Sequence, residues 1–160
     1  MKKLKIETEL DVFESVSELS EHIQELMNKA HEARKNAYAP YSHFQVGAAL
    51  LLDSGEIVIG NNQENAAFPS GLCAERVAAF HAGALYPSSK FVAMAVTAGS
   101  LKQETTVPIP PCGACRQSLA EYEVKQKLPI PIYFMGVSGK VVRSQSVKDL
   151  LPLIFDNSYL

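Results

Sequence analysis

Hydrophobic residues recur at helical spacing near the start of the chain and then in a nearly continuous run. From Leu19 to Ala37 an apolar residue returns every three or four positions, which predicts one amphipathic helix that ends before Pro40. Ser15 and Glu18, three residues apart, have the pattern of a capping box for this helix. The segment from Phe44 to Leu52 is largely apolar instead, which is typical of a strand buried on both faces.

Strand and helix patterns alternate through the rest of the chain. We predict strands at 57–60, 91–98, 130–137 and 141–143, helices at 74–85 and 113–124, and a short last helix through Leu151, capped by Ser146 and Asp149. The stretch from Lys3 to Phe13 alternates loosely, as a short strand or an ordered arm does. The order α-β-β-α-β-α-β-β-α predicts an α/β fold, a three-layer α/β/α sandwich around a mixed five-stranded sheet.

Length and composition narrow the class of protein. A chain of 160 residues, 47% of them hydrophobic, fits one domain with a substantial core. We assign residues 19–160 to this domain and residues 1–18 to an N-terminal extension without an assigned role. Fifteen basic and seventeen acidic residues give a net charge of −2, so the basic stripe of a nucleic-acid binder is missing and a small substrate is favoured.

The N-terminal segment and the apolar runs bear on localisation. Residues 1–10 carry three lysines and two glutamates and have no apolar core of a secretory signal. The longest apolar run, residues 46–52, is far shorter than the ~20 residues that span a bilayer. We therefore expect a soluble, cytoplasmic protein without membrane partners.

All three cysteines lie in two short motifs, Cys73-Ala-Glu75 and Pro111-Cys-Gly-Ala-Cys115. An odd number of cysteines is poorly suited to a disulfide framework, whereas three thiolates suit a zinc ion and leave one tetrahedral position free for water. Each motif falls at the start of a predicted helix, where free N–H groups stabilise a thiolate. We predict that Cys73, Cys112 and Cys115 bind zinc and that Glu75 moves protons for the water.

Two neighbours of the cysteines affect this prediction. Arg76 is placed to hydrogen-bond a thiolate and so offset part of the negative charge around the metal. His81 is a candidate fourth ligand for a purely structural zinc, but it lies two helical turns beyond Cys73. A redox-active Cys-x-x-Cys pair or plainly buried cysteines would also fit these motifs. Glu75 favours a catalytic site, because a scaffold has no need of a proton carrier.

Together with two further blocks, these motifs resemble the small, homotetrameric, three-cysteine type of cytidine deaminase. The resemblance runs from about Leu19 to Phe155. Its four blocks are Tyr38–Leu50 (YAPYSHFQVGAAL), Gly60–Ala67 (GNNQENAA), Cys73–Arg76 (CAER) and Pro111–Gln117 (PCGACRQ). The cysteine motifs alone would indicate only the wider deaminase superfamily.

The resemblance implies a reaction and a cofactor. The reaction is the hydrolytic deamination of cytidine and 2′-deoxycytidine to uridine and 2′-deoxyuridine plus ammonia, as in pyrimidine salvage. One zinc ion per subunit would activate the water that attacks carbon 4 of cytosine. Glu75 would be the catalytic residue, which takes a proton from water, protonates ring nitrogen 3 and then helps ammonia leave.

The resemblance also implies how the nucleoside is bound. Asn62 and Glu64 would hydrogen-bond the ribose hydroxyls, Phe44 would pack against the pyrimidine ring, and Ala74 would contact the substrate. Phe155 would reach the pocket of a neighbouring subunit in a homotetramer. On the residues alone, Asn62 also fits a polar turn, and Phe44 and Phe155 also fit ordinary packing roles.

The sequence departs from the family pattern at two positions, and other functions compete with this one. His43 stands where the family often has lysine, and Phe68 where it often has tyrosine.

A deaminase of an aminonucleoside antibiotic would share the zinc motifs but depart in the block around Glu64. A polynucleotide editor usually carries histidine in place of Cys73 and needs basic surface. A zinc-stabilised binding module without turnover is the competing hypothesis from a different class of protein.

Overall fold

The computed structural model describes all residues, 1–160. In chain order the elements are β1 (Asp11–Phe13), the 3₁₀ helix η1 (Val16–Glu18), α1 (Glu21–Lys35), β2 (Phe44–Leu52), β3 (Ile57–Asn61), the 3₁₀ helix η2 (Phe68–Ser70), α2 (Ala74–Leu85), β4 (Phe91–Ser100), α3 (Gly113–Gln126), β5 (Ile132–Met135), β6 (Val141–Ser144), α4 (Val147–Leu150) and the 3₁₀ helix η3 (Asn157–Tyr159). No helix is long and apolar enough to cross a membrane.

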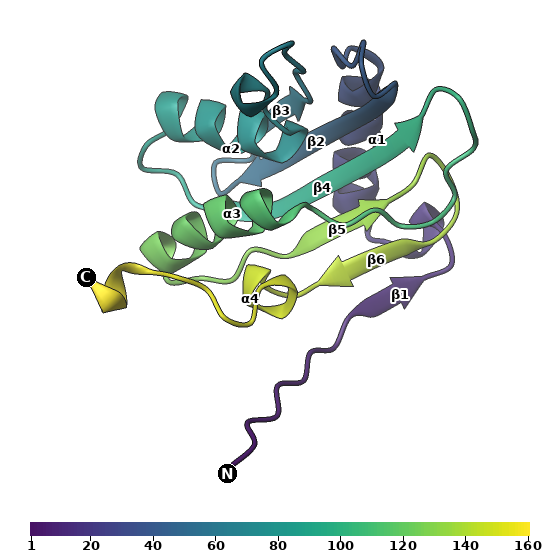
Figure 1. The fold of residues 1–160 in the computed structure, drawn as a ribbon. Helices are drawn as coiled ribbons and strands as arrows, with labels where there is room; N and C mark the ends of the chain where they lie inside the picture. The colour runs from purple at the N-terminus through teal and green to yellow at the C-terminus, as the bar shows by residue number, and fades with distance from the viewer.

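One mixed sheet forms the middle layer of the molecule (Figure 1). Its strand order is β1-β6-β5-β4-β2-β3, and β4 and β5 run parallel while every other neighbouring pair is antiparallel. The predicted five strands are all present. The sheet has six strands rather than five, because residues 11–13 of the N-terminal extension add β1 to the edge at β6.

Helices cover both faces of the sheet, so the predicted three-layer α/β/α sandwich is confirmed (Figure 1). On β2 the alternation of side chains divides the core, because Ala48 and Leu50 pack beneath α2 and α3 while Ala49 packs beneath α1. The core on the side of α1 joins Leu26 and Met27 to residues of β4, β5 and β6. The nearly continuous apolar run of β2 follows from this burial on both faces.

The start of α1 differs from the prediction. Ser15 and Glu18 do not cap this helix, because Val16–Glu18 forms a separate 3₁₀ turn and Leu19 after it is extended, with φ −82° and ψ 159°. Helix α1 itself begins at Glu21, and the side chain of Ser20 before it makes no capping hydrogen bond. Glu18 instead accepts a hydrogen bond from the backbone N–H of Glu14 at 2.9 Å.

At the last helix the predicted capping box is confirmed. Ser146 Oγ accepts from the N–H of Lys148 at 3.1 Å, and Asp149 Oδ2 accepts from the N–H of Ser146 at 2.9 Å. This exchange satisfies two N–H groups that a helix start leaves free, which stabilises a helix of only four residues.

Strand β5 is shorter than the predicted 130–137. The N–H of Ile130 is donated to the buried carboxylate of Glu123 at 2.8 Å, and the N–H of Val137 to the carbonyl of Thr105 at 2.7 Å. The backbone N–H groups at both ends of the apolar run are therefore bonded to groups outside the sheet. The strand is limited to Ile132–Met135, which is buried.

Candidate active site and metal centre

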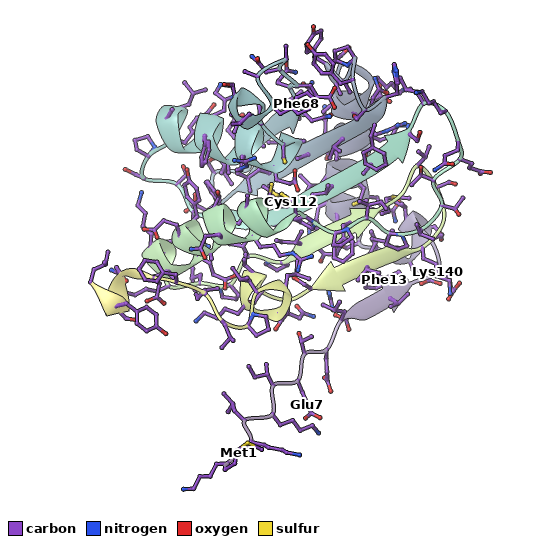
Figure 2. The ribbon with its side chains drawn as sticks, viewed as in Figure 1. Met1, Glu7, Phe13, Phe68, Cys112 and Lys140 are labelled. Atoms are coloured by element: carbon purple, nitrogen blue, oxygen red, sulfur yellow. The ribbon has the colours of Figure 1, made fainter.

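The three cysteines converge where two helices begin on the same side of the sheet. Cys73 is the residue that precedes α2, and Cys112 occupies the same position before α3. Cys115 lies in the first turn of α3 and is buried, whereas Cys112 is exposed. Figure 2 shows Cys112 between the starts of these helices, which Figure 1 labels. Helix N-termini concentrate free N–H groups and partial positive charge, which favours thiolates at these positions.

The distances within this cluster fit a tetrahedral zinc ion. The Sγ atoms of Cys73 and Cys112 lie 3.7 Å apart and those of Cys112 and Cys115 3.5 Å, and all three lie within 4.8 Å of one another. Tetrahedral Zn–S bonds of about 2.3 Å require sulfurs roughly 3.8 Å apart. No fourth histidine, cysteine or carboxylate joins the cluster, and His81 lies exposed on α2. The ligand set is therefore that of an open site.

Hydrogen bonds within the cluster decide which sulfur is ionised first. The pKa of the Cys73 thiol is lowered to about 5, because Cys115 hydrogen-bonds its sulfur and Arg76 adds a second donor. The Arg76 Nη2 group donates to Cys73 Sγ at 3.6 Å. The pKa of Cys115 is raised, since it donates to Cys73 and is buried. Arg76 thus offsets negative charge at the cluster, as the sequence predicted.

Glu75 lies in the first turn of α2, two residues after Cys73. Its side chain is only 3% exposed, and its Oε2 atom has no hydrogen-bond partner. Burial raises the pKa of this carboxyl, and the neighbouring Cys73 thiolate acts in the same direction. An unpartnered buried carboxylate oxygen is costly for a fold. Such an atom is expected where a carboxyl group must accept and release a proton.

Beside the cluster lies a cavity of about 690 Å³, within the range of small-molecule sites. Phe44 and Val46 of β2 and Val96 and Ala98 of β4 form an apolar wall. Two polar groups of residues also line the cavity. One comes from the cysteine motifs and consists of Cys73, Glu75, Arg76 and Cys112. The other is the block Asn62, Gln63, Glu64 and Asn65. Phe44, Asn62 and Glu64, predicted to bind substrate, therefore share one cavity with Cys73 and Cys112, two of the three predicted metal ligands.

The polar end of the cavity is held by backbone groups. Glu64 accepts from the hydroxyl of Ser42, and its Oε2 accepts from the N–H of Tyr41 at 2.8 Å. The Ser42 hydroxyl and these backbone N–H groups hold the pKa of Glu64 below its usual range, so it is a carboxylate at neutral pH. Asn62 Oδ1 accepts from the N–H of Val46 at 2.8 Å.

Asn62 makes a second bond to the same strand, from Nδ2 to the carbonyl of Phe44 at 2.9 Å. Its amide still has one N–H and one lone pair free for a ligand. Because both bonds go to β2, the side chain is fixed against the strand that also carries Phe44.

Two predicted substrate contacts lie apart from this cavity. Ala74, at the start of α2, is fully buried, backbone included. Phe155 lies beyond α4, is 60% exposed and stacks on Tyr159 with ring centroids 5.7 Å apart. Neither residue lines the cavity of its own chain.

Several lining residues were not singled out as contacts from the sequence. Tyr41 and Phe68 meet edge to face at the mouth, with ring centroids 5.9 Å apart. Val96 of β4 and Ile109 and Pro110 before α3 complete the apolar lining. Alternation along β4 could have assigned Val96 to this face, but no local signal distinguishes a loop residue that lines a cavity from one that faces water.

A catalytic metal centre at paired helix starts, beside a cavity in an α/β/α sandwich, defines the class of zinc-dependent deaminases. Residues 20–128 match the family model described as "Cytidine and deoxycytidylate deaminase zinc-binding region". The cytidine deaminase of Halalkalibacterium halodurans is 42% identical over 134 residues, 82% of this chain and 92% of that protein. That of Sporosarcina psychrophila is 40% identical over 138 residues, 86% and 94% of the two chains.

Solved structures agree with this assignment. The crystal structure of cytidine deaminase from Burkholderia pseudomallei superposes with a TM-score of 0.71 at 40% identity, covering 86% of this chain and all of that one. The chain belongs to the cytidine and deoxycytidylate deaminase family.

Proposed function

We propose that this protein deaminates cytidine and 2′-deoxycytidine by zinc-dependent hydrolysis, producing uridine and 2′-deoxyuridine plus ammonia, as in pyrimidine salvage. The observation that carries the proposal is the buried Glu75, whose Oε2 has no hydrogen-bond partner and which lines one cavity together with Cys73 and Cys112 of the three-cysteine cluster. Its relatives of 40–42% identity over most of the chain are named cytidine deaminases, which supports the same substrate here.

Cys73, Cys112 and Cys115 would hold the zinc ion, and Arg76 would moderate their charge through Cys73. When bound, the ion supplies Lewis-acid activation of water at neutral pH. The residues of the chain then have two tasks, which are to orient the nucleoside and to carry protons between water and the base.

Glu75 would carry both protons of the reaction. As water adds to carbon 4 of cytosine, Glu75 accepts one proton and passes it to ring nitrogen 3. It next accepts the proton of the new hydroxyl and passes it to the amino group. The carbon–nitrogen bond then breaks, ammonia leaves and the carbonyl of uridine forms. A carboxyl whose pKa is raised by burial suits this exchange, because it must bind and release a proton in turn.

Specificity for a nucleoside would come from the polar end of the cavity. Phe44 would pack against the pyrimidine, while Asn62 and the Glu64 carboxylate would bind ribose hydroxyls. An ionised Glu64 accepts hydrogen bonds from hydroxyl groups and repels a phosphate at the same place. Ala74 would contact the substrate at the start of α2, between Cys73 and Glu75, which both line the cavity.

We further propose a cytoplasmic homotetramer in which Phe155 completes the pocket of a neighbouring subunit. The ring of Phe155 is exposed and outside its own cavity, which leaves it available to another subunit. Three free thiols used as metal ligands favour a reducing compartment.

The test of the proposed chemistry is Glu75→Gln, which keeps the shape of the side chain and removes its proton exchange. We expect the zinc content to be unchanged and ammonia release from cytidine to fall by about three orders of magnitude or more. Glu56→Gln, in the exposed turn between β2 and β3, is the matched control and should retain wild-type turnover. Normal activity of Glu75→Gln would rule out Glu75 as the proton carrier.

A further inference from the structure

The N-terminal arm, residues 1–10, leaves the body of the molecule as an extended chain (Figure 1). Figure 2 shows Met1 and Glu7 along this segment, well away from the sheet. From residue 3 to residue 10, charged and uncharged residues alternate, which gives an extended chain one charged face and one face of three apolar side chains and Thr8. Leu4 is 84% exposed, whereas Ile6 and Leu10, nearer the body, are 47% and 39% exposed, so the apolar surface left open lies toward the free end of the arm.

The end of the arm nearest the body is firmly attached. Asp11 and Arg143 form an ion pair at 2.8 Å, and Glu14 and Lys140 form another at 2.9 Å. The hydroxyl of Thr8 donates to the carbonyl of Asp149 at 2.9 Å. Strand β1 lies at the end of the strand order, so its second edge has no partner. A fixed base and an open edge make the arm a template for another strand.

Charge is segregated along the arm. The basic residues Lys3 and Lys5 come first, and the acidic residues Glu7 and Glu9 follow on the same face. Of these four residues, Lys5 and Glu7 form an ion pair within one chain, and Lys3 and Glu9 do not. When two identical strands of this kind run antiparallel, the basic half of each lies opposite the acidic half of the other.

We propose that the arm pairs with the arm of a second copy of this chain, as an antiparallel two-stranded ribbon centred on Ile6. In this register Lys5 lies opposite Glu7 of the second copy and Lys3 opposite its Glu9, and the two Ile6 side chains meet at the two-fold axis. The faces that carry Leu4, Ile6 and Thr8 coincide, with Leu4 opposite Thr8 of the second copy. The arm is thus an interface between subunits, independent of the cavity and of the proposed function.

Other registers are disfavoured by the same charges. A shift by one residue places charged side chains against the apolar face, because side chains alternate with a period of two. A shift that centres the ribbon on residue 5 places Lys5 opposite Lys5, and one centred on residue 7 places Glu7 opposite Glu7. A parallel, in-register pair would align every lysine and every glutamate with its own kind, which is destabilising.

Cysteine cross-linking in the full-length, zinc-loaded protein tests the pairing and its register. Ile6→Cys places two thiols face to face at the axis, within reach of a disulfide. In Thr8→Cys the two thiols lie four residues apart along the ribbon, about 13 Å, which a disulfide cannot bridge. Under mild oxidation we expect Ile6→Cys to form a covalent dimer at least about tenfold faster than Thr8→Cys. The unmodified chain controls for its own cysteines.

Charge variants on the Ile6→Cys background test complementarity. An acidic arm, Lys3→Glu/Lys5→Glu, and a basic arm, Glu7→Lys/Glu9→Lys, should each cross-link with itself about tenfold more slowly than the parent. Mixing the two should restore the rate as a heterodimer. The matched control combines all four substitutions in one chain. It keeps the net charge, exchanges the positions of the basic and acidic residues, and should cross-link as fast as the parent.

Three results would overturn the proposal. Covalent dimers that form equally fast in Ile6→Cys and Thr8→Cys would exclude the antiparallel register. If neither variant forms a covalent dimer, the arm does not pair with a second copy and serves another partner. A mixture of acidic and basic arms that cross-links no faster than either alone would exclude charge complementarity between copies.

Discussion

At the scale of residues, hydrogen bonds and charge set the protonation of the clustered cysteines. Cys73 holds a thiolate at neutral pH because Cys115 and Arg76 donate to it, and Cys115 retains its proton. Cys73, Cys112 and Cys115 would hold a zinc ion with Cys115 deprotonated as well. Metal binding and stability are therefore coupled, since the ligands must be deprotonated and brought together by the fold.

Removal of one ligand tests this coupling. In Cys112→Ala only two thiolates remain, so we expect zinc to be absent by elemental analysis and the melting temperature to fall. The wild-type protein treated with a chelator should melt close to the variant, whose own melting temperature should not respond to the chelator. Ser118→Ala, on the same helix α3, is the control and should keep its zinc. Full zinc occupancy in Cys112→Ala would remove Cys112 from the ligand set.

Residue types and spacing predicted the cysteine cluster, because zinc ligation restricts the usable residues and both motifs stand at helix starts. The role of Glu75 as proton carrier stays a prediction. Spacing did not predict the Glu64 bonds to Tyr41 and Ser42, which lie more than twenty positions away in a loop. The predicted roles of Asn62 and Glu64 in binding ribose remain to be measured.

At the scale of elements, β3 determines where α2 begins. A Cβ atom on Gly60 would lie 2.5 Å from both the carbonyl oxygen of Ala74 and the N–H nitrogen of Ala78. Strand and helix are therefore in direct backbone contact at this point. Because Cys73 and Glu75 stand at this end of α2, the contact also fixes the proposed metal ligand and the proposed proton carrier.

Gly60→Ala should push α2 away from β3. We expect a loss of about 1–3 kcal/mol in the free energy of unfolding, measured by denaturant titration of the zinc-loaded protein, together with weaker zinc retention. Gly113→Ala, whose added Cβ meets nothing within 4 Å, is the control and should change stability by no more than about 0.5 kcal/mol. An unchanged unfolding midpoint in Gly60→Ala would show that α2 can shift without cost.

Hydrophobic periodicity predicted the long elements and missed details that depend on single hydrogen bonds. Ser15 and Glu18 have the spacing of a capping box, but they do not cap α1. Glu18 accepts a hydrogen bond from Glu14 and belongs to a 3₁₀ turn that is separate from α1. Strand β1 was ambiguous, because an exposed alternating segment becomes a strand only when an edge such as β6 is available.

At the scale of the whole molecule, the sheet separates two cores with different roles. The core beneath α1 closes one face, and the core beneath α2 and α3 supports the metal cluster and the cavity. Order and patterning of the elements were sufficient to predict these layers. They were not sufficient for the assembly, because exposed residues such as Phe155 and Leu4 have the same appearance in the sequence whether they meet water or another subunit.

The most direct test of the proposed function is ammonia release from cytidine by the purified, zinc-replete protein, with cytidine monophosphate in parallel. We predict rapid turnover of cytidine and none of the monophosphate, because the Glu64 carboxylate accepts from a hydroxyl and repels a phosphate. A folded, zinc-loaded protein that releases no ammonia from cytidine would contradict the proposed function.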